Sequence, residues 1–135
     1  MPAHRKSIFI TGTDTGVGKT VITAALAWTI LRAGKRAAVM KPVQTGACGP
    51  GLTDIEFVEK VLGASYDLEE VCPYRFPKPL SPLTASALSG KIIDPEKIRN
   101  AYLALKSRND FVIVEGAGGL LVPIREDYLL SLIHI

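Results

Sequence analysis

Residues 12–20 place glycines, a lysine and a threonine in the order that a phosphate-binding loop requires. They read Gly-Thr-Asp-Thr-Gly-Val-Gly-Lys-Thr, after the apolar residues 8–10 and before a helical pattern that begins at Val21. Backbone N–H groups in such a loop form a concave anion site, and the following helix N-terminus adds partial positive charge. Lys19 could reach the outer phosphates of a nucleotide, and the Thr20 hydroxyl could ligate phosphate-bound Mg²⁺.

The spacing of this loop is a variant of the regular pattern, which has four residues between its first glycine and Gly-Lys. Here Thr13 stands at the first glycine position, and Gly12 comes one residue early. Chance clustering could explain a single glycine in this segment. The Gly-Lys-Thr triplet between an apolar run and a helical pattern favours a nucleotide site.

The elements that must position this loop are short uncharged strands alternating with helices. Strands are expected at 7–11, 36–40 and 111–114, and helices at 20–33, 53–62, 83–88 and 95–107. Residues 41–51 read as loop, the proline-rich residues 74–82 as irregular, and the glycines after Glu115 as a sharp end to the third strand. This alternation predicts an α/β fold with a parallel sheet and helices on both faces.

The carboxyl ends of parallel strands meet at one edge of the sheet, where ligands bind. The phosphate loop, Lys41 and Glu115 each follow a predicted strand, so we expect them to converge. Glu115 matches an acidic Mg²⁺ ligand, although a solvated strand-end carboxylate would look the same. Asp54 could cap a helix, ligate Mg²⁺ or do both. Lys41 could be a solvated lysine, or could join Lys19 in stabilising charge during phosphoryl transfer.

Composition restricts the class of protein. The 135 residues suit one domain, the formal charge of +3 is mild, and the chain contains no long run of like charges. We therefore expect neither nucleic acid nor a membrane as a partner. Cys48 and Cys72 lack the spacing of a metal site, so free thiols and a cytoplasmic location are expected.

Together these residues resemble the dethiobiotin synthetases, which close the ureido ring in biotin synthesis with ATP. The resemblance covers residues 7–128, and the variant loop is this family's own form. The motifs that carry it are Thr-Gly-Thr-Asp-Thr-Gly-Val-Gly-Lys-Thr at 11–20, Lys-Pro-Val-Gln-Thr-Gly at 41–46, Gly-Leu-Thr-Asp at 51–54, Val-Glu-Gly-Ala-Gly-Gly at 114–119 and, more weakly, Pro-Leu-Ser-Pro at 79–82.

The resemblance implies roles for individual residues. Lys41 would be the active-site lysine, acting with Lys19. Thr45 would contact the diamine substrate, and Asp14 and Thr15 would help to orient it. The Mg²⁺ ligands would be Thr20, Asp54 and Glu115. The nucleotide would be bound by Gly16, Val17, Gly18, Lys19, Thr20, Val21, Asp54, Glu115, Gly116, Ala117 and Gly118. Some members carry Glu at the position of Gly16, and a contact from that side chain is absent here.

The implied reaction uses ATP, CO2 or bicarbonate, and 7,8-diaminononanoate. One amine captures CO2 as a carbamate, the carbamate attacks the γ-phosphate of ATP, and the second amine closes the ring, releasing ADP and phosphate. The protein mainly positions reactants and neutralises oxyanions, and it needs no nucleophile of its own.

The resemblance also implies how much of the family's fold this chain covers and how the full-length protein assembles. Family members have a P-loop NTPase-like fold and are usually longer. We expect residues 1–135 to be a single P-loop ATP-binding domain, the N-terminal half of the usual fold, truncated within the apolar run 129–135. The full-length protein would be a homodimer.

Three alternatives stay open at this point. A partitioning ATPase would usually carry a lysine five residues before Lys19, where this chain has Asp14. An amidating synthetase of the cobyrinic acid type shares the fold and an acidic strand end. A non-catalytic nucleotide-binding fragment is the third.

Overall fold

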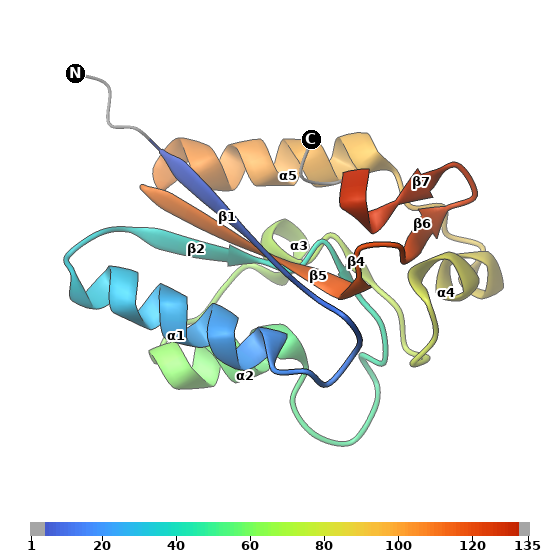
Figure 1. Cartoon of the computed structure of the whole chain (residues 1–135), viewed down its shortest axis with the longest axis horizontal. Helices are drawn as coiled ribbons and strands as arrows, with labels where there is room; N and C mark the ends of the chain where they lie inside the picture. Colours follow the sequence, from blue (N-terminus) through green and yellow to red (C-terminus); the bar gives the residue numbers. More distant parts are fainter. Residues whose placement is uncertain (1–4, 133–135) are drawn as a thin grey trace.

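A computed structural model describes residues 5–132 and places three parallel strands at the centre of the molecule (Figure 1). In chain order the elements are β1 (Lys6–Gly12), α1 (Lys19–Arg32), β2 (Ala37–Met40), β3 (Val43–Gln44), α2 (Asp54–Leu62), α3 (Leu68–Val71), β4 (Tyr74–Arg75), α4 (Pro82–Ser89), α5 (Pro95–Arg108), β5 (Phe111–Gly119), β6 (Pro123–Arg125) and β7 (Tyr128–Leu129), followed by a 3-10 turn at Leu130–Leu132.

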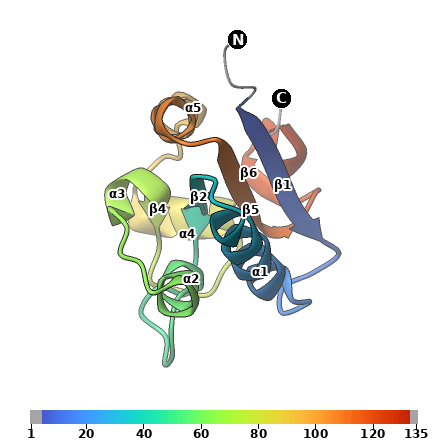
Figure 2. The ribbon, with the colours of Figure 1, turned by 90° about the vertical axis from the view of Figure 1, so that its left-hand side faces the viewer.

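The sheet has the strand order β1-β5-β2, so the last long strand in the chain lies between the first two. Ile113 of β5 pairs with Ile8 on one side and Val39 on the other. Figure 2 shows α1 on one side of this sheet and α5 on the other. Val112 and Ile113 are 0% exposed, as expected of an apolar strand buried on both faces. The predicted α/β fold is therefore confirmed.

Three local expectations are wrong. The segment 41–51 contains β3, and the proline-rich segment 74–82 contains β4; these short strands pair in parallel. The prolines follow Arg75 in the sequence, so both residues of β4 keep the N–H that pairing requires. Tyr74 is also anchored by burial and by stacking on Phe76 at 6.5 Å between ring centroids.

The third error concerns β5, which continues through the glycines to Gly119 instead of ending at Glu115. Glycine keeps its backbone N–H, and beyond an irregularity in the pairing Gly119 lies opposite Gly12 of β1. Close packing explains a glycine at position 116, because a Cβ atom there would lie 2.8 Å from Leu130 Cδ2. The short helix α3 and the hairpin β6–β7 were not predicted, although Asp67, whose side chain caps α3, is a usual helix-start signal.

Helix α2 begins with a complete capping box. The Thr53 backbone N–H donates to Glu56 Oε2 at 2.7 Å, and Thr53 Oγ1 accepts from the Glu56 N–H at 3.4 Å. The backbone N–H and then the hydroxyl of Thr53 lower the pKa of the Glu56 carboxyl. Gly63 ends the helix with a φ of 62°. The cap bears on the predicted site because Asp54, a candidate site residue, is the first helical residue after it.

No helix in the described range 5–132 is long and apolar enough to cross a lipid bilayer.

Both cysteines carry free thiols, as predicted. Cys48 is exposed, whereas burial raises the pKa of the Cys72 thiol to about 12. Residues 133–135 of the terminal apolar run lie outside the described residues.

We predict that Thr53→Ala lowers the free energy of unfolding by about 1 kcal/mol, because it removes the hydroxyl half of the capping box. Urea denaturation measures the change. Thr29→Ala is the matched control, since the exposed Thr29 hydroxyl only bonds back to the Ala25 carbonyl within α1. An equal loss of stability in both variants would contradict a specific role for the cap.

We predict that one thiol reacts quickly with an aromatic disulfide reagent at pH 8, and the second only after denaturation. The raised pKa keeps the Cys72 thiol protonated at that pH, and the thiolate is the reactive form. Cys48→Ser should remove the fast phase. Two fast thiols in the native protein would show that Cys72 is accessible.

Candidate nucleotide and metal site

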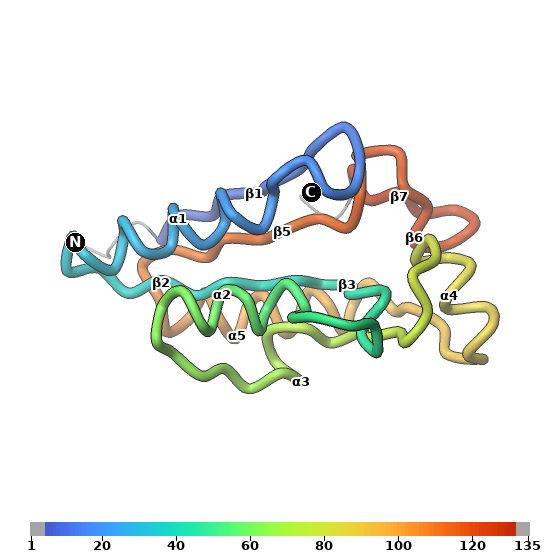
Figure 3. Tube along the Cα trace, turned by 90° about the horizontal axis from the view of Figure 1, so that it is seen from below, coloured from blue at the N-terminus to red at the C-terminus, as the bar shows by residue number. Residues whose placement is uncertain are grey.

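A cleft of about 1140 Å³ lies at the end of the sheet where β1, β2 and β5 finish. Figure 3 shows the loop after β1, the start of β3 and the end of β5 at this same end of the molecule. The convergence predicted from the strand ends is therefore observed. The described residues that line the cleft include Asp14, Thr15, Gly16, Gly18, Lys19, Thr20, Val21, Lys41, Thr45, Asp54, Glu115, Ala117 and Gly118.

The loop between β1 and α1 has the conformation that its glycines allow. Gly16 and Gly18 have φ values of 69° and 102°, in the left-handed region that side chains disfavour. Gly18 is also the N-cap of α1, so this helix begins without a side chain in front of its first N–H groups. Such an open helix N-terminus favours an anion.

Lys19 is held inside this loop rather than extended into solvent. Only 8% of the residue is exposed, and Nζ donates to the backbone carbonyl of Asp14. The ammonium group therefore lies across the mouth of the loop, with its charge close to the N-terminus of α1. Two sources of positive charge meet where a phosphate would bind.

Oxygen ligands from three elements meet directly beside the loop. Thr20 Oγ1, on the first turn of α1, lies 3.0 Å from Asp54 Oδ1 of α2 and 2.9 Å from Glu115 Oε1 of β5. Asp54 thus faces the cleft, and Thr53 takes the N-cap position that Asp54 could have filled. The N-cap role considered for Asp54 is therefore wrong, because Thr53 caps α2 and the Asp54 carboxylate contacts Thr20 and Lys41; its role as a Mg²⁺ ligand stays a prediction.

Lys41 follows β2 and completes this cluster. Its side chain is 5% exposed, and Nζ lies 2.7 Å from Asp54 Oδ2, 3.0 Å from Glu115 Oε1 and 3.1 Å from the Gly116 carbonyl oxygen. Burial opposes the charged form of Lys41, but the carboxylates of Glu115 and Asp54 outweigh it and raise the pKa of the ammonium. Lys41 is therefore a paired cation, and the solvated-lysine alternative is wrong.

The remaining predicted residues are placed as follows. Asp14 Oδ1 accepts from the Thr15 N–H at 2.7 Å, and Thr45, which follows β3, lines the same cleft. Two predicted residues do not line the cleft. Val17 is 53% exposed and packs its side chain over Gly12, and Gly116 contributes through its carbonyl to Lys41.

Sequence reasoning missed Gln44 and the wall formed by residues 120–123. Gln44 Nε2 donates to the Thr45 carbonyl at 2.7 Å, while Oε1 is buried and has no partner among residues 5–132. Its position inside the 41–46 motif was an available signal. Residues 120–123 are apolar apart from their backbone, so their types gave no indication of a site.

The chemistry of this donor set fits Mg²⁺ held together with nucleotide phosphates. Thr20, Asp54 and Glu115 offer oxygen atoms, which Mg²⁺ prefers, and Mg²⁺ is commonly held by one or two carboxylates plus phosphate oxygens. No group of three or more His, Cys, Asp or Glu side chains able to form a complete metal cage occurs within residues 5–132. The cluster thus suits a Mg²⁺ ion held jointly by the protein and nucleotide phosphates better than one held by the protein alone.

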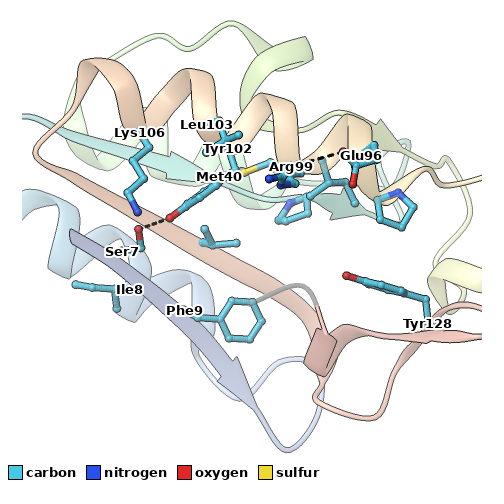
Figure 4. A pocket seen from close by; sticks show the side chains of 14 residues that line it. Ser7, Ile8, Phe9, Met40, Glu96, Arg99, Tyr102, Leu103, Lys106 and Tyr128 are labelled. Carbon is cyan, nitrogen blue, oxygen red and sulfur yellow. Dashed lines mark hydrogen bonds and ion pairs between the residues drawn. The ribbon is translucent and has the colours of Figure 1, made fainter. Parts of the chain in front are cut away.

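A second cavity, of about 560 Å³, lies on the α5 side of the sheet. Figure 4 shows Ser7 of β1 pointing toward Tyr102 of α5, and their hydroxyl groups are hydrogen-bonded. Ile8, Phe9 and Met40 supply apolar walls. None of the predicted site residues lines this cavity, so the chemistry described above belongs to the cleft.

Comparison with known proteins agrees with the motifs. The family model described as an AAA domain matches residues 6–134. Proteins named ATP-dependent dethiobiotin synthetase BioD are similar to this chain. The one from Methanococcus vannielii is 43% identical over 92% of this chain and 57% of its own length. Those from Nitrosospira multiformis and Methanocaldococcus jannaschii are 45% and 43% identical, over 90% and 92% of this chain and 54% and 58% of their own lengths.

The chain thus spans a little over half the length of these relatives, and within that span the resemblance drawn from its motifs is confirmed. The loop, the parallel sheet and the family match agree, and the chain belongs to the AAA domain family.

Proposed function

We propose that this chain acts in the ATP-dependent synthesis of dethiobiotin from 7,8-diaminononanoate and CO2. The observation that carries the proposal is the convergence of Thr20, Lys41, Asp54 and Glu115 beside a phosphate loop. Relatives with the printed name ATP-dependent dethiobiotin synthetase support the same reaction. Their names do not favour the partitioning ATPase or the amidating synthetase.

We base the proposed role of each site residue on its place in the cleft or the phosphate loop. Residues 16–21 hold the phosphates of ATP through backbone N–H groups, with Lys19 neutralising the outer phosphates. Thr20, Asp54 and Glu115 hold Mg²⁺, which when bound would neutralise charge on the phosphate oxygens. Lys41 stabilises the oxyanions of the reacting groups. Thr45, Asp14 and Thr15 orient the diamine.

The chain's residues suit a reaction in which the substrates supply the nucleophiles. One amine of the diamine adds to CO2 and loses a proton, and the carbamate oxygen then attacks the γ-phosphate and displaces ADP. The second amine then displaces phosphate and closes the cyclic urea. The protein holds the carbamate and the γ-phosphate together in a partly closed cleft and stabilises negative charge there. Asp14 and Thr45 both line the cleft, which supports the proposal that they bind polar groups of the diamine.

Assembly and location belong to the same proposal. We propose a single P-loop domain that acts in the cytoplasm and, at the full length of its relatives, as a homodimer. The substrates are small molecules, and neither nucleic acid nor a membrane takes part.

The reaction is tested by mixing the chain with Mg-ATP, ¹³C-bicarbonate and 7,8-diaminononanoate. We expect mass spectrometry to find the label in the ring of a cyclic urea, and Lys41→Ala to abolish it. Lys35→Ala, which changes an exposed lysine after α1, should retain the product. ATP binding without labelled product would favour the non-catalytic alternative.

We predict that Thr20→Val weakens binding of Mg-ATP by about tenfold or more, because it removes a hydroxyl ligand while keeping the side-chain shape. Binding of ATP in EDTA should change less than twofold. Fluorescent nucleotide titration measures both affinities. Thr29→Val, on the exposed face of the same helix, is the matched control. Equal weakening with and without Mg²⁺ would place Thr20 outside the metal site.

A further inference from the structure

The ammonium of Lys41 lies between the same two carboxylates that are proposed to hold Mg²⁺. Its three polar contacts are Asp54 Oδ2 at 2.7 Å, Glu115 Oε1 at 3.0 Å and the Gly116 carbonyl oxygen at 3.1 Å. An ammonium group has three N–H donors, so each has an acceptor in this arrangement. Lys41 is thus fully satisfied where it lies.

The carboxylate oxygens are engaged from the other side as well. Thr20 Oγ1 lies within hydrogen-bond distance of Asp54 Oδ1 and Glu115 Oε1. Glu115 Oε1 therefore has both Lys41 Nζ and Thr20 Oγ1 as partners. A Mg²⁺ ion would need these oxygens at 2.0–2.1 Å. It could bind here only by displacing hydrogen bonds that are already formed.

Burial makes this competition strong. The Lys41 and Glu115 side chains are 5% and 3% exposed, so water screens their charges little. A divalent cation entering beside Lys41 would meet a fixed positive charge at short range, and the ammonium would lose acceptors that water cannot easily replace. A nucleotide triphosphate changes this balance, because its oxygens can accept from Lys41 and ligate the metal at the same time.

We propose that Lys41 is a resident counter-ion that keeps free divalent cations out of the site and makes metal binding conditional on nucleotide phosphate. This inference rests on the metal site of the proposed function, and it adds a positioning role for Lys41 before any reaction begins. When nucleotide and metal arrive together, the ammonium exchanges carboxylate oxygens for phosphate oxygens. The same exchange brings its charge to the transferring group.

The test measures Mn²⁺ binding by the loss of the free-ion signal in electron paramagnetic resonance, without nucleotide. We expect Lys41→Met to bind Mn²⁺ at least about tenfold more tightly than the unaltered chain, because one nearby positive charge is removed. Lys41→Arg keeps the charge and should show no gain. Lys35→Met changes the net charge equally, but Lys35 follows the C-terminal end of α1, the end away from the site, so this variant should show no gain either.

Equal Mn²⁺ affinities in Lys41→Met and the unaltered chain would overturn the proposal. The proposal would also be overturned if the unaltered chain bound Mn²⁺ tightly without nucleotide and added ATP did not increase that affinity. These measurements need no turnover. A chain that forms no cyclic urea but gains Mn²⁺ affinity in Lys41→Met would refute the proposed reaction and retain this inference.

A second measurement keeps the test decisive if Lys41→Met does not fold, since it leaves two carboxylates without their cation. The ¹⁵Nζ resonance of Lys41 in the unaltered chain is followed during titration. We expect Mg²⁺ alone at millimolar concentration to leave it in place and Mg²⁺ with a non-hydrolysable ATP analogue to shift it. A shift with Mg²⁺ alone would overturn the proposal.

Discussion

The contact of the buried Lys41 ammonium with the carboxylates of Glu115, which is buried, and Asp54, which is partly exposed, is the constraint on which the rest of the site depends. Charges removed from water are costly unless each finds partners with good geometry. Here the partners come from β2, α2 and β5, which are far apart in the sequence. The cluster is satisfied only when all three elements reach their native positions, so it couples the formation of the site to the formation of the fold.

The parallel sheet meets this constraint through its strand order. Because β5 lies between β1 and β2, Glu115 at its carboxyl half is a direct neighbour of both the phosphate loop and Lys41. The glycines after Glu115 allow β5 to approach the phosphate loop closely. A Cβ atom at Gly119 would lie 3.2 Å from the Gly12 carbonyl oxygen, so this approach of β5 to the loop requires small residues.

The sequence could predict what depends on strand polarity and on local capping signals. Thr20, Lys41 and Glu115 follow strands or open a helix, so their convergence follows from the parallel arrangement alone. Asp54 was ambiguous because a helix-start carboxylate looks the same whether it caps or faces a ligand. The pairing of β3 with β4 could not be seen, since two-residue strands have no periodicity and adjacent prolines indicate irregular backbone. Gln44 was missed although it lies inside the 41–46 motif, because that segment was expected to be loop and instead contains β3.

The arrangement of charge also suits the proposed reaction, in which the substrates supply the nucleophiles. Lys19 is bonded to a loop carbonyl and Lys41 to two carboxylates, so both cations are fixed in place before a ligand binds. Fixed charges need little reorganisation when negative charge develops on a bound oxygen, and in a partly closed cleft water screens them less. The ion pairs of Lys41 thereby hold a positive charge beside the phosphate loop, where the proposed phosphoryl transfer would need it.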